Sequence, residues 1–191
     1  MMIKTKDTDY IFIYRQSDAE GRLSLMMENF AVFPKVIRKA EKKTMYRIRA
    51  EREYLRSHSR DELGVRVQSS KLGDVTADEA VANVTLEEAF RTGYIDRSIL
   101  KGMDDVSAYE DDIRTINIMR MDYELLEEII EDLDKNDTRV IKQYLLEGRL
   151  FKEIADDEGR TYEAIKKRVE RIRRDIREEI IACLELNCRE D

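Results

Sequence analysis

The sequence predicts a mainly α-helical protein that ends in a helix-turn-helix and begins with a small β-hairpin. The 191 residues include one Pro and seven Gly, so few residues interrupt a helix. Apolar residues recur at helical spacing over 113–133, and a helix–Gly–helix pattern follows. We expect three parts. They are an N-terminal segment with the hairpin over 1–33, a basic helix, a loop and an acidic helical region over 34–112, and a long helix plus the helix-turn-helix over 113–191.

Composition limits the class of protein. Hydrophobic residues make up 42% and charged residues 40% of the chain, which excludes a wholly disordered protein. No apolar run approaches the roughly 18 residues of a membrane span, and the N-terminus lacks a signal-peptide core, so we expect a soluble, cytoplasmic protein. Cys183 and Cys188 lie far in sequence from the sole histidine, His58. We therefore expect neither a metal site nor a cofactor.

The net charge of −7 averages segments of opposite sign. Residues 35–66 hold eleven basic and five acidic residues, a net charge of +6. Residues 74–134 hold five basic and eighteen acidic residues, a net charge of −13. Residues 160–177 hold eight basic and three acidic residues, a net charge of +5. Because the local field acts on an approaching polyanion, an acidic total does not exclude nucleic-acid binding. For residues 35–66, the alternative to nucleic-acid binding is a charged helix face that is simply exposed to solvent.

The N-terminal part resembles two strands joined by a turn. Residues 9–15 are rich in β-branched and aromatic side chains, 17–21 supply turn residues, and 23–27 are apolar again. This order predicts the β-hairpin. Pro34 closes the segment and suits the first residue of a helix.

A basic helix is expected from Lys35 to about Ser57, where no breaker occurs. Its apolar stripe has near-helical spacing and consists of Ile37, Ala40, Ile48 and Leu55. Residues 64–74 read as a loop or a short extended stretch. Thr76 and Glu79 then form a capping-box pattern that opens a helix towards Gly93.

The clearest periodicity runs from Ile113 to Leu133. Its apolar residues are spaced by 3, 4, 3, 4 and 3 and are Ile116, Met119, Tyr123, Leu126, Ile130 and Leu133. This seam predicts a helix packed against neighbouring helices of the same chain. The alternative is a coiled-coil seam that makes a homodimer.

The helix-turn-helix follows. Asp137 is expected to cap a helix over Thr138–Glu147, which Gly148 ends. In the next pair of helices, Ala155 is small enough for a close crossing, Gly159 can adopt the positive φ of the turn, and Thr161 can cap the second helix. The core that sets the crossing angle is expected to consist of Ile154, Ile165 and Val169.

The second helix keeps its apolar residues on one face. The remaining faces carry Lys166, Lys167, Arg171, Arg173, Arg174 and Arg177. A capped N-terminus with a basic outer face suits insertion into a DNA major groove. The alternative is an ordinary helical hairpin with a solvated basic face.

The stretch from about Ile129 to Arg177 resembles region four of bacterial sigma factors. The run from Ala164 to Arg173 is similar to the Thr-Val-Lys-Ser-Arg-Leu-x-Arg-Ala-Arg run of extracytoplasmic-function sigma factors, in which this helix reads the −35 promoter element. The resemblance implies that Tyr162, Glu163 and Lys167 face bases and that Arg160, Lys166 and Arg171 hold phosphates. The candidate DNA-binding residues are Arg160, Thr161, Tyr162, Glu163, Lys166, Lys167, Arg171 and Arg174.

Two features separate the chain from that family. Leu150 stands where the family has a capping Ser or Thr, and the absence of Trp argues against the promoter-melting region of a complete sigma factor. The order of segments, with Val65–Ser70 between the basic and acidic helices, resembles phage late-gene activators of the RinA and ArpU type.

This second resemblance implies a sequence-specific transcription regulator that acts on double-stranded DNA with bacterial RNA polymerase. The alternative is a DNA-packaging protein like a small terminase subunit, although that family usually carries its DNA-binding element at the N-terminus. We do not expect an enzyme, because the sequence offers no phosphate-binding glycine loop and no histidine paired with a nucleophile.

Overall fold

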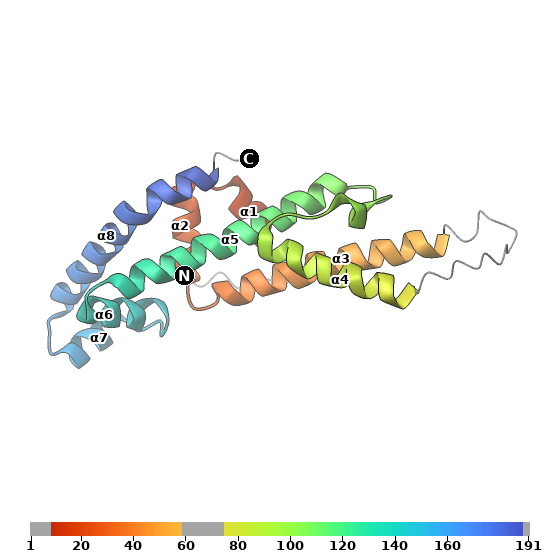
Figure 1. Ribbon diagram of the computed structural model, residues 1–191. Coiled ribbons are helices and arrows are strands. Elements are labelled where there is room, and N and C mark those ends of the chain that lie inside the picture. Colours follow the sequence, from red (N-terminus) through yellow and green to blue (C-terminus); the bar gives the residue numbers. More distant parts are fainter. Residues whose placement is uncertain (1–8, 59–74, 189–191) are drawn as a thin grey trace, which may run out of the picture. The chain divides into compact units, whose positions relative to one another are not determined.

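The computed structural model describes residues 9–58 and 75–188, without the side chains of 75–78, and within these ranges it is mainly α-helical (Figure 1). This confirms the mainly α class. The elements are α1 (Tyr10–Gln16), α2 (Ala19–Glu28), α3 (Phe33–His58), α4 (Val75–Thr92), the 3₁₀ helix η1 (Arg97–Leu100), α5 (Val106–Asp132), α6 (Lys135–Leu145), α7 (Phe151–Glu158) and α8 (Tyr162–Cys188). None of the described helices is long and apolar enough to cross a membrane.

The predicted N-terminal hairpin is wrong, because α1 and α2 occupy its place. The Asp9 carboxylate accepts a hydrogen bond from the Phe12 amide at 3.3 Å, and the Asp18 carboxylate accepts one from the Gly21 amide at 2.8 Å. The turn residue Asp18 is therefore a helix N-cap. Ile11 and Tyr14, three residues apart, are buried on one face of α1, so the helical period applies where the composition favours strands.

The chain divides into two compact units, one formed by Met1–Val36 with Met119–Asp191 and the other by Ile37–Ile118. The first unit thus contains the N-terminal helices together with the C-terminal part of the chain. In the first unit α2 packs along α8.

Aromatic side chains form part of the core of this first unit. Phe33 stacks on Tyr123 with ring centroids 5.5 Å apart, and Phe30 lies 5.2 Å from the same ring. The Tyr123 hydroxyl donates to the Phe30 carbonyl at 3.1 Å. These contacts attach the segment between α2 and α3 to α5, and a buried tyrosine keeps a partner for its hydroxyl.

A buried carboxylate joins several helices of the same unit. Asp122 of α5 accepts hydrogen bonds from the Tyr14 hydroxyl at 2.7 Å and from the Asn187 amide at 2.6 Å. An Arg22 nitrogen lies 4.0 Å away. Burial raises the pKa of Asp122, although all three neighbours favour its ionised form. Two hydrogen bonds thus tie the buried Asp122 of α5 to α1 and α8, and such buried bonds favour one arrangement of these helices.

The basic helix is confirmed as α3, with Ile37, Ala40 and Ile48 buried. The expected loop over 64–74 and the Thr76 cap lie outside the described residues and side chains. Helix α4 ends at Thr92, one residue before Gly93, which has φ +75° as a helix-terminating glycine does.

Polar contacts hold α3, α4, η1 and α5 together in the second unit. The Tyr109 hydroxyl donates to Glu51 at 2.6 Å, and burial together with this carboxylate raises the pKa of Tyr109 to about 12. The Asn117 amide donates to the Arg91 carbonyl at 2.8 Å. Arg47 forms an ion pair with Asp112 at 3.3 Å.

Helix α5 starts at Val106, seven residues before the predicted Ile113. The predicted seam is buried within the chain, with Leu133 half-buried just after the helix. The fully or nearly fully buried seam residues are Ile116, Met119, Tyr123, Leu126 and Ile130. Intrachain packing is therefore confirmed, and this face is not available as a coiled-coil seam.

Candidate nucleic-acid interface

The first helix of the C-terminal part starts earlier than predicted. Asp134 is the N-cap of α6, since its carboxylate accepts hydrogen bonds from the amides of Asn136 at 2.9 Å and Asp137 at 3.2 Å. The prediction that Asp137 caps this helix is wrong. Asp137 lies in the first turn and is only 4% exposed. An aspartate three residues earlier satisfies the same free amides, which leaves the second carboxylate for another role.

Helix α7 begins after a glycine turn and has an unusual cap. Helix α6 ends at Leu145, two residues before the predicted Glu147, and Gly148 adopts φ +64°. Leu150 offers no side-chain acceptor, but the Glu153 carboxylate accepts a hydrogen bond from the Leu150 amide at 2.8 Å. This hydrogen bond is one half of a capping box, and the other half, a side-chain acceptor at the N-cap, is missing.

The turn between α7 and α8 forms as the sequence predicts. Gly159 adopts φ +60° and ψ +37°, and the Arg160 amide donates to the Ala155 carbonyl at 2.9 Å. The Thr161 hydroxyl oxygen accepts from the Ala164 amide at 3.3 Å, so Thr161 caps α8. Glycine suits the left-handed residue because it has no Cβ to clash.

Buried side chains fix the crossing of α7 and α8. The three predicted core residues, Ile154, Ile165 and Val169, are at most 1% exposed, and Ala155 at the crossing is 3% exposed. A row of aromatic rings adds to this core. Phe151 stacks on Tyr144 of α6 with centroids 5.1 Å apart, and its edge faces Tyr162 of α8 at 6.0 Å. Figure 1 shows α6, α7 and the start of α8 close together.

Asp137 braces α8 against α6. Its carboxylate accepts from Arg168 at 2.5 Å and from Arg171 at 2.7 Å. Burial alone would raise the pKa of Asp137, but the two guanidinium groups together hold it below its ordinary value. The hydrogen bond to Asp137 raises the pKa of Arg171. Sequence reasoning assigned Asp137 to a helix cap and did not include Arg168 among the DNA-binding residues. Nothing in the local sequence indicates a pairing of residues that are 31 positions apart.

Most of the predicted DNA-binding residues lie together on an exposed surface at the start of α8. Tyr162 is 47% exposed despite its contact with Phe151. Arg160, Glu163 and Lys167 are exposed, whereas Lys166 is half-buried on the flank. Arg174 is exposed two turns beyond Lys167 and lies 3.7 Å from Asp175.

Arg171 differs from the other predicted contacts. One terminal nitrogen bonds to Asp137, and the other lies 3.5 Å from Asp175. Farther along the helix, Arg177 pairs bidentately with Glu20 of α2, a partner that sequence reasoning also missed. Both arginines therefore hold α8 in place within its unit.

Helix α8 continues beyond the part that covers α7. Ile176, Ile180 and Leu184 are fully buried, and α2 lies along this helix. Asn187 near its end reaches the buried Asp122 of α5. The helix is thus anchored at both ends in one unit, with the exposed basic surface at its N-terminal end.

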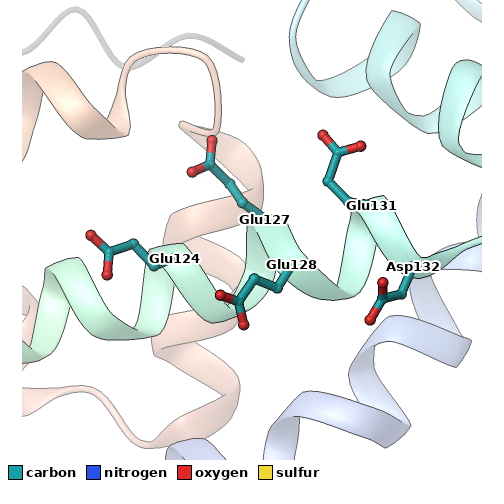
Figure 2. Close-up of a pocket in the computed structure, with 5 residues that line it drawn as sticks. All are labelled: Glu124, Glu127, Glu128, Glu131 and Asp132. Atoms are coloured by element: carbon teal, nitrogen blue, oxygen red, sulfur yellow. The ribbon is translucent and has the colours of Figure 1, made fainter.

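Acidic side chains occupy two nearby surfaces of the same unit. Helix α7 exposes Asp156 and Asp157, the latter paired with Arg149. Figure 2 shows the acidic face of α5, where Glu127 and Glu131 project to one side of the helix and Glu128 and Asp132 to the other. Its residues are Glu124, Glu127, Glu128, Glu131 and Asp132. Within the described ranges no group of three or more potential metal ligands converges.

No family model, curated protein or solved structure matches the chain. What the α7–α8 pair can bind therefore follows from its own shape and charge. A capped helix N-terminus directs free amides and a positive dipole outward, and the first turns of α8 add exposed Arg and Lys side chains. Such a surface attracts anions, phosphates in particular.

Proposed function

We propose that this protein is a sequence-specific DNA-binding transcription regulator in which α7 and α8 form a helix-turn-helix and α8 enters the major groove. The observation that carries the proposal is the exposed surface of the first two turns of α8 behind the Gly159 turn and the Thr161 cap. In DNA-binding proteins of this class, the N-terminal residues of the second helix contact base edges.

Individual roles follow from exposure and residue type. Tyr162, Glu163 and Lys167 project from the start of the helix, where a lysine can donate to guanine and a glutamate can accept from cytosine. Arg160 before the helix and Lys166 on its flank are placed to neutralise phosphates.

Arg174 is the third residue assigned to phosphates, because its side chain is 64% exposed. We assign Arg171 to a positioning role instead, since its guanidinium is held by Asp137. Three phosphate contacts would contribute a slope of about −2.7 to the dependence of log K on log salt.

The regulatory role and its partner rest on the resemblance to sigma region four and to phage activators. Both imply DNA near a promoter and cooperation with bacterial RNA polymerase. We therefore propose phage or prophage promoters as the targets of this regulator.

Selection from a random duplex library by the full-length protein, followed by sequencing of the bound DNA, tests the proposal. We expect one enriched motif. Lys167→Ala should relax the preference at one position of that motif, whereas Lys166→Ala should weaken all sequences alike and reduce the salt slope by about 0.9.

The matched control is Lys101→Ala, which removes an exposed cation next to η1. It should change neither the motif nor the slope. A library with no enriched sequence, or a Lys167→Ala protein with the preference of the control, would refute base reading by α8.

A further inference from the structure

The outer face of α3 carries a stripe of cations that the α8 surface does not account for. Lys39, Lys42, Tyr46 and Arg49 follow one another at spacings of 3, 4 and 3, so they share one face of the helix. All four are exposed, and Tyr46 is 74% exposed. Arg38 and Lys43 flank this row and are exposed as well. We call these six residues the basic stripe.

The stripe lies opposite the buried face of its helix. Ile37, Thr44 and Ile48 of α3 are at most 5% exposed and belong to the core. Their positions are out of phase with the stripe by about half a turn at 3.6 residues per turn. The stripe therefore faces away from the helices that α3 packs against in its unit.

The charges of the stripe are not compensated within the described part of the chain. Elsewhere on α3, Arg47 pairs with Asp112 and Arg56 pairs with Glu53 and Glu79. The stripe cations themselves have no ion pair with a described residue. They also form like-charged neighbours at helical spacing, such as Arg38 with Lys42 and Lys39 with Lys43, which destabilise a helix by a few tenths of a kcal/mol per pair.

We infer that the basic stripe binds the sugar–phosphate backbone of duplex DNA without reading its sequence. Lys39 and Arg49 are about 15 Å apart along the helix axis, a length of about four base pairs. Lysine, arginine and the tyrosine hydroxyl are all donors to phosphate oxygens. Counterions are released from the stripe and from the DNA on binding, and their release favours association. In the free protein, by contrast, the like charges of the stripe repel one another.

The inference rests on the proposed function for the identity of the polyanion, and it explains how an acidic protein holds DNA. The net charge of −7 opposes association, and Arg168, Arg171 and Arg177 of α8 are engaged in ion pairs. A second basic surface, on the unit that does not contain α8, adds affinity that is independent of base sequence.

The decisive experiment compares Lys42→Gln/Arg49→Gln with Lys101→Gln/Arg114→Gln in the full-length protein. Both variants remove two exposed cations, so they change the net charge equally. Binding to a random-sequence duplex is measured by fluorescence anisotropy over a series of salt concentrations. The wild-type slope should be steeper than the −2.7 or so that three contacts of α8 can supply.

The stripe variant should have a slope shallower by about 1.8 and should bind roughly tenfold or more weakly at 0.1 M salt. The control should match the wild type. The ratio of affinities for a selected motif and for random DNA should stay constant in the stripe variant. Equal slopes for the stripe variant and the control would overturn the inference, as would a loss confined to anionic vesicles or single-stranded RNA tested in parallel.

These results separate the two proposals. If α8 does not read bases, no motif is selected and Lys167→Ala has no effect on preference, yet the stripe variant still weakens random-duplex binding. If only the stripe inference fails, a motif is selected and the stripe variant binds it like the wild type. Unchanged helical circular dichroism of both double variants shows that substitutions of exposed side chains leave the fold intact.

Discussion

Replacing Asp137 by Asn tests how α8 is held on α6. The Asp137 side chain is 5% exposed, and it accepts two hydrogen bonds from guanidinium groups, of Arg168 at 2.5 Å and of Arg171 at 2.7 Å. The substitution keeps the shape of the side chain and removes its charge. It leaves one oxygen as an acceptor, so one of the two hydrogen bonds is lost and the other becomes weaker.

The magnitude follows from the exposure of the partners. A hydrogen bond to a charged group contributes about 1.5–3 kcal/mol. The Arg168 and Arg171 side chains are 26% and 48% exposed, so water rehydrates much of each guanidinium once the carboxylate is gone. We therefore expect a loss at the lower end, about 1–2 kcal/mol in the free energy of unfolding.

Urea denaturation of the full-length protein, followed by circular dichroism, measures this loss. The matched control is Glu110→Gln, which breaks the bidentate pair with Arg97. That guanidinium is 79% exposed, so the control should lose much less. Arg168→Gln in the Asp137→Asn background should add little, because both changes disrupt the same cluster.

The pH dependence has a definite sign. Because the pKa of Asp137 is lowered in the folded protein, the brace is fully present above the ordinary carboxyl pKa of about 3.9 and is lost as the pH falls through the lowered value. The difference in stability between wild type and Asp137→Asn should therefore shrink in acid. A loss at neutral pH no larger than that of Glu110→Gln, or one that persists unchanged in strong acid, would show that Asp137 does not brace α8.

Two further substitutions test the turn and the buried network. Gly159→Ala should lower the free energy of unfolding by about 1–2 kcal/mol in urea denaturation, because φ is +60°. No atom lies within 4 Å of the added Cβ, so the cost comes from the backbone alone. Gly148→Ala, with φ +64° and equal space, is the matched control and should cost the same, so a much larger loss at Gly159 would contradict a purely backbone effect. Tyr14→Phe removes the 2.7 Å hydrogen bond to buried Asp122 and should cost about 1.5 kcal/mol; an unchanged thermal midpoint would mean that this bond contributes nothing net.

Sequence reasoning succeeds where a local pattern has a single solution. The seam of α5 repeats over several turns, so only a helix brings its apolar residues to one side, and these residues are buried. The Gly159 turn and the Thr161 cap depend on contacts within a few residues, which the sequence contains in full. The same holds for α3, which no breaker interrupts.

It fails where the outcome depends on distant residues or on a short segment. Residues 10–16 have a strand-like composition, and so short an apolar run does not distinguish a period of 2 from one of 3.6. The Asp9 cap and the burial of Tyr14 decide for a helix. Asp137 fits an N-cap as well as Asp134 by residue type, and only the arginines of α8 show which one turns inward.

The sequence by itself determined the helical class, the presence of the long basic helix and of the apolar seam of α5, and the turn that precedes the exposed start of α8, because backbone hydrogen bonds and apolar periodicity act over a few residues. Only the tertiary structure decided which basic residues of α8 stay available for phosphates. Arg171 is held by a carboxylate 34 residues earlier and Arg177 by one 157 residues earlier. The arginines of α8 cannot be told apart by residue type. The partner of each one depends on which surfaces the packing of apolar faces brings together.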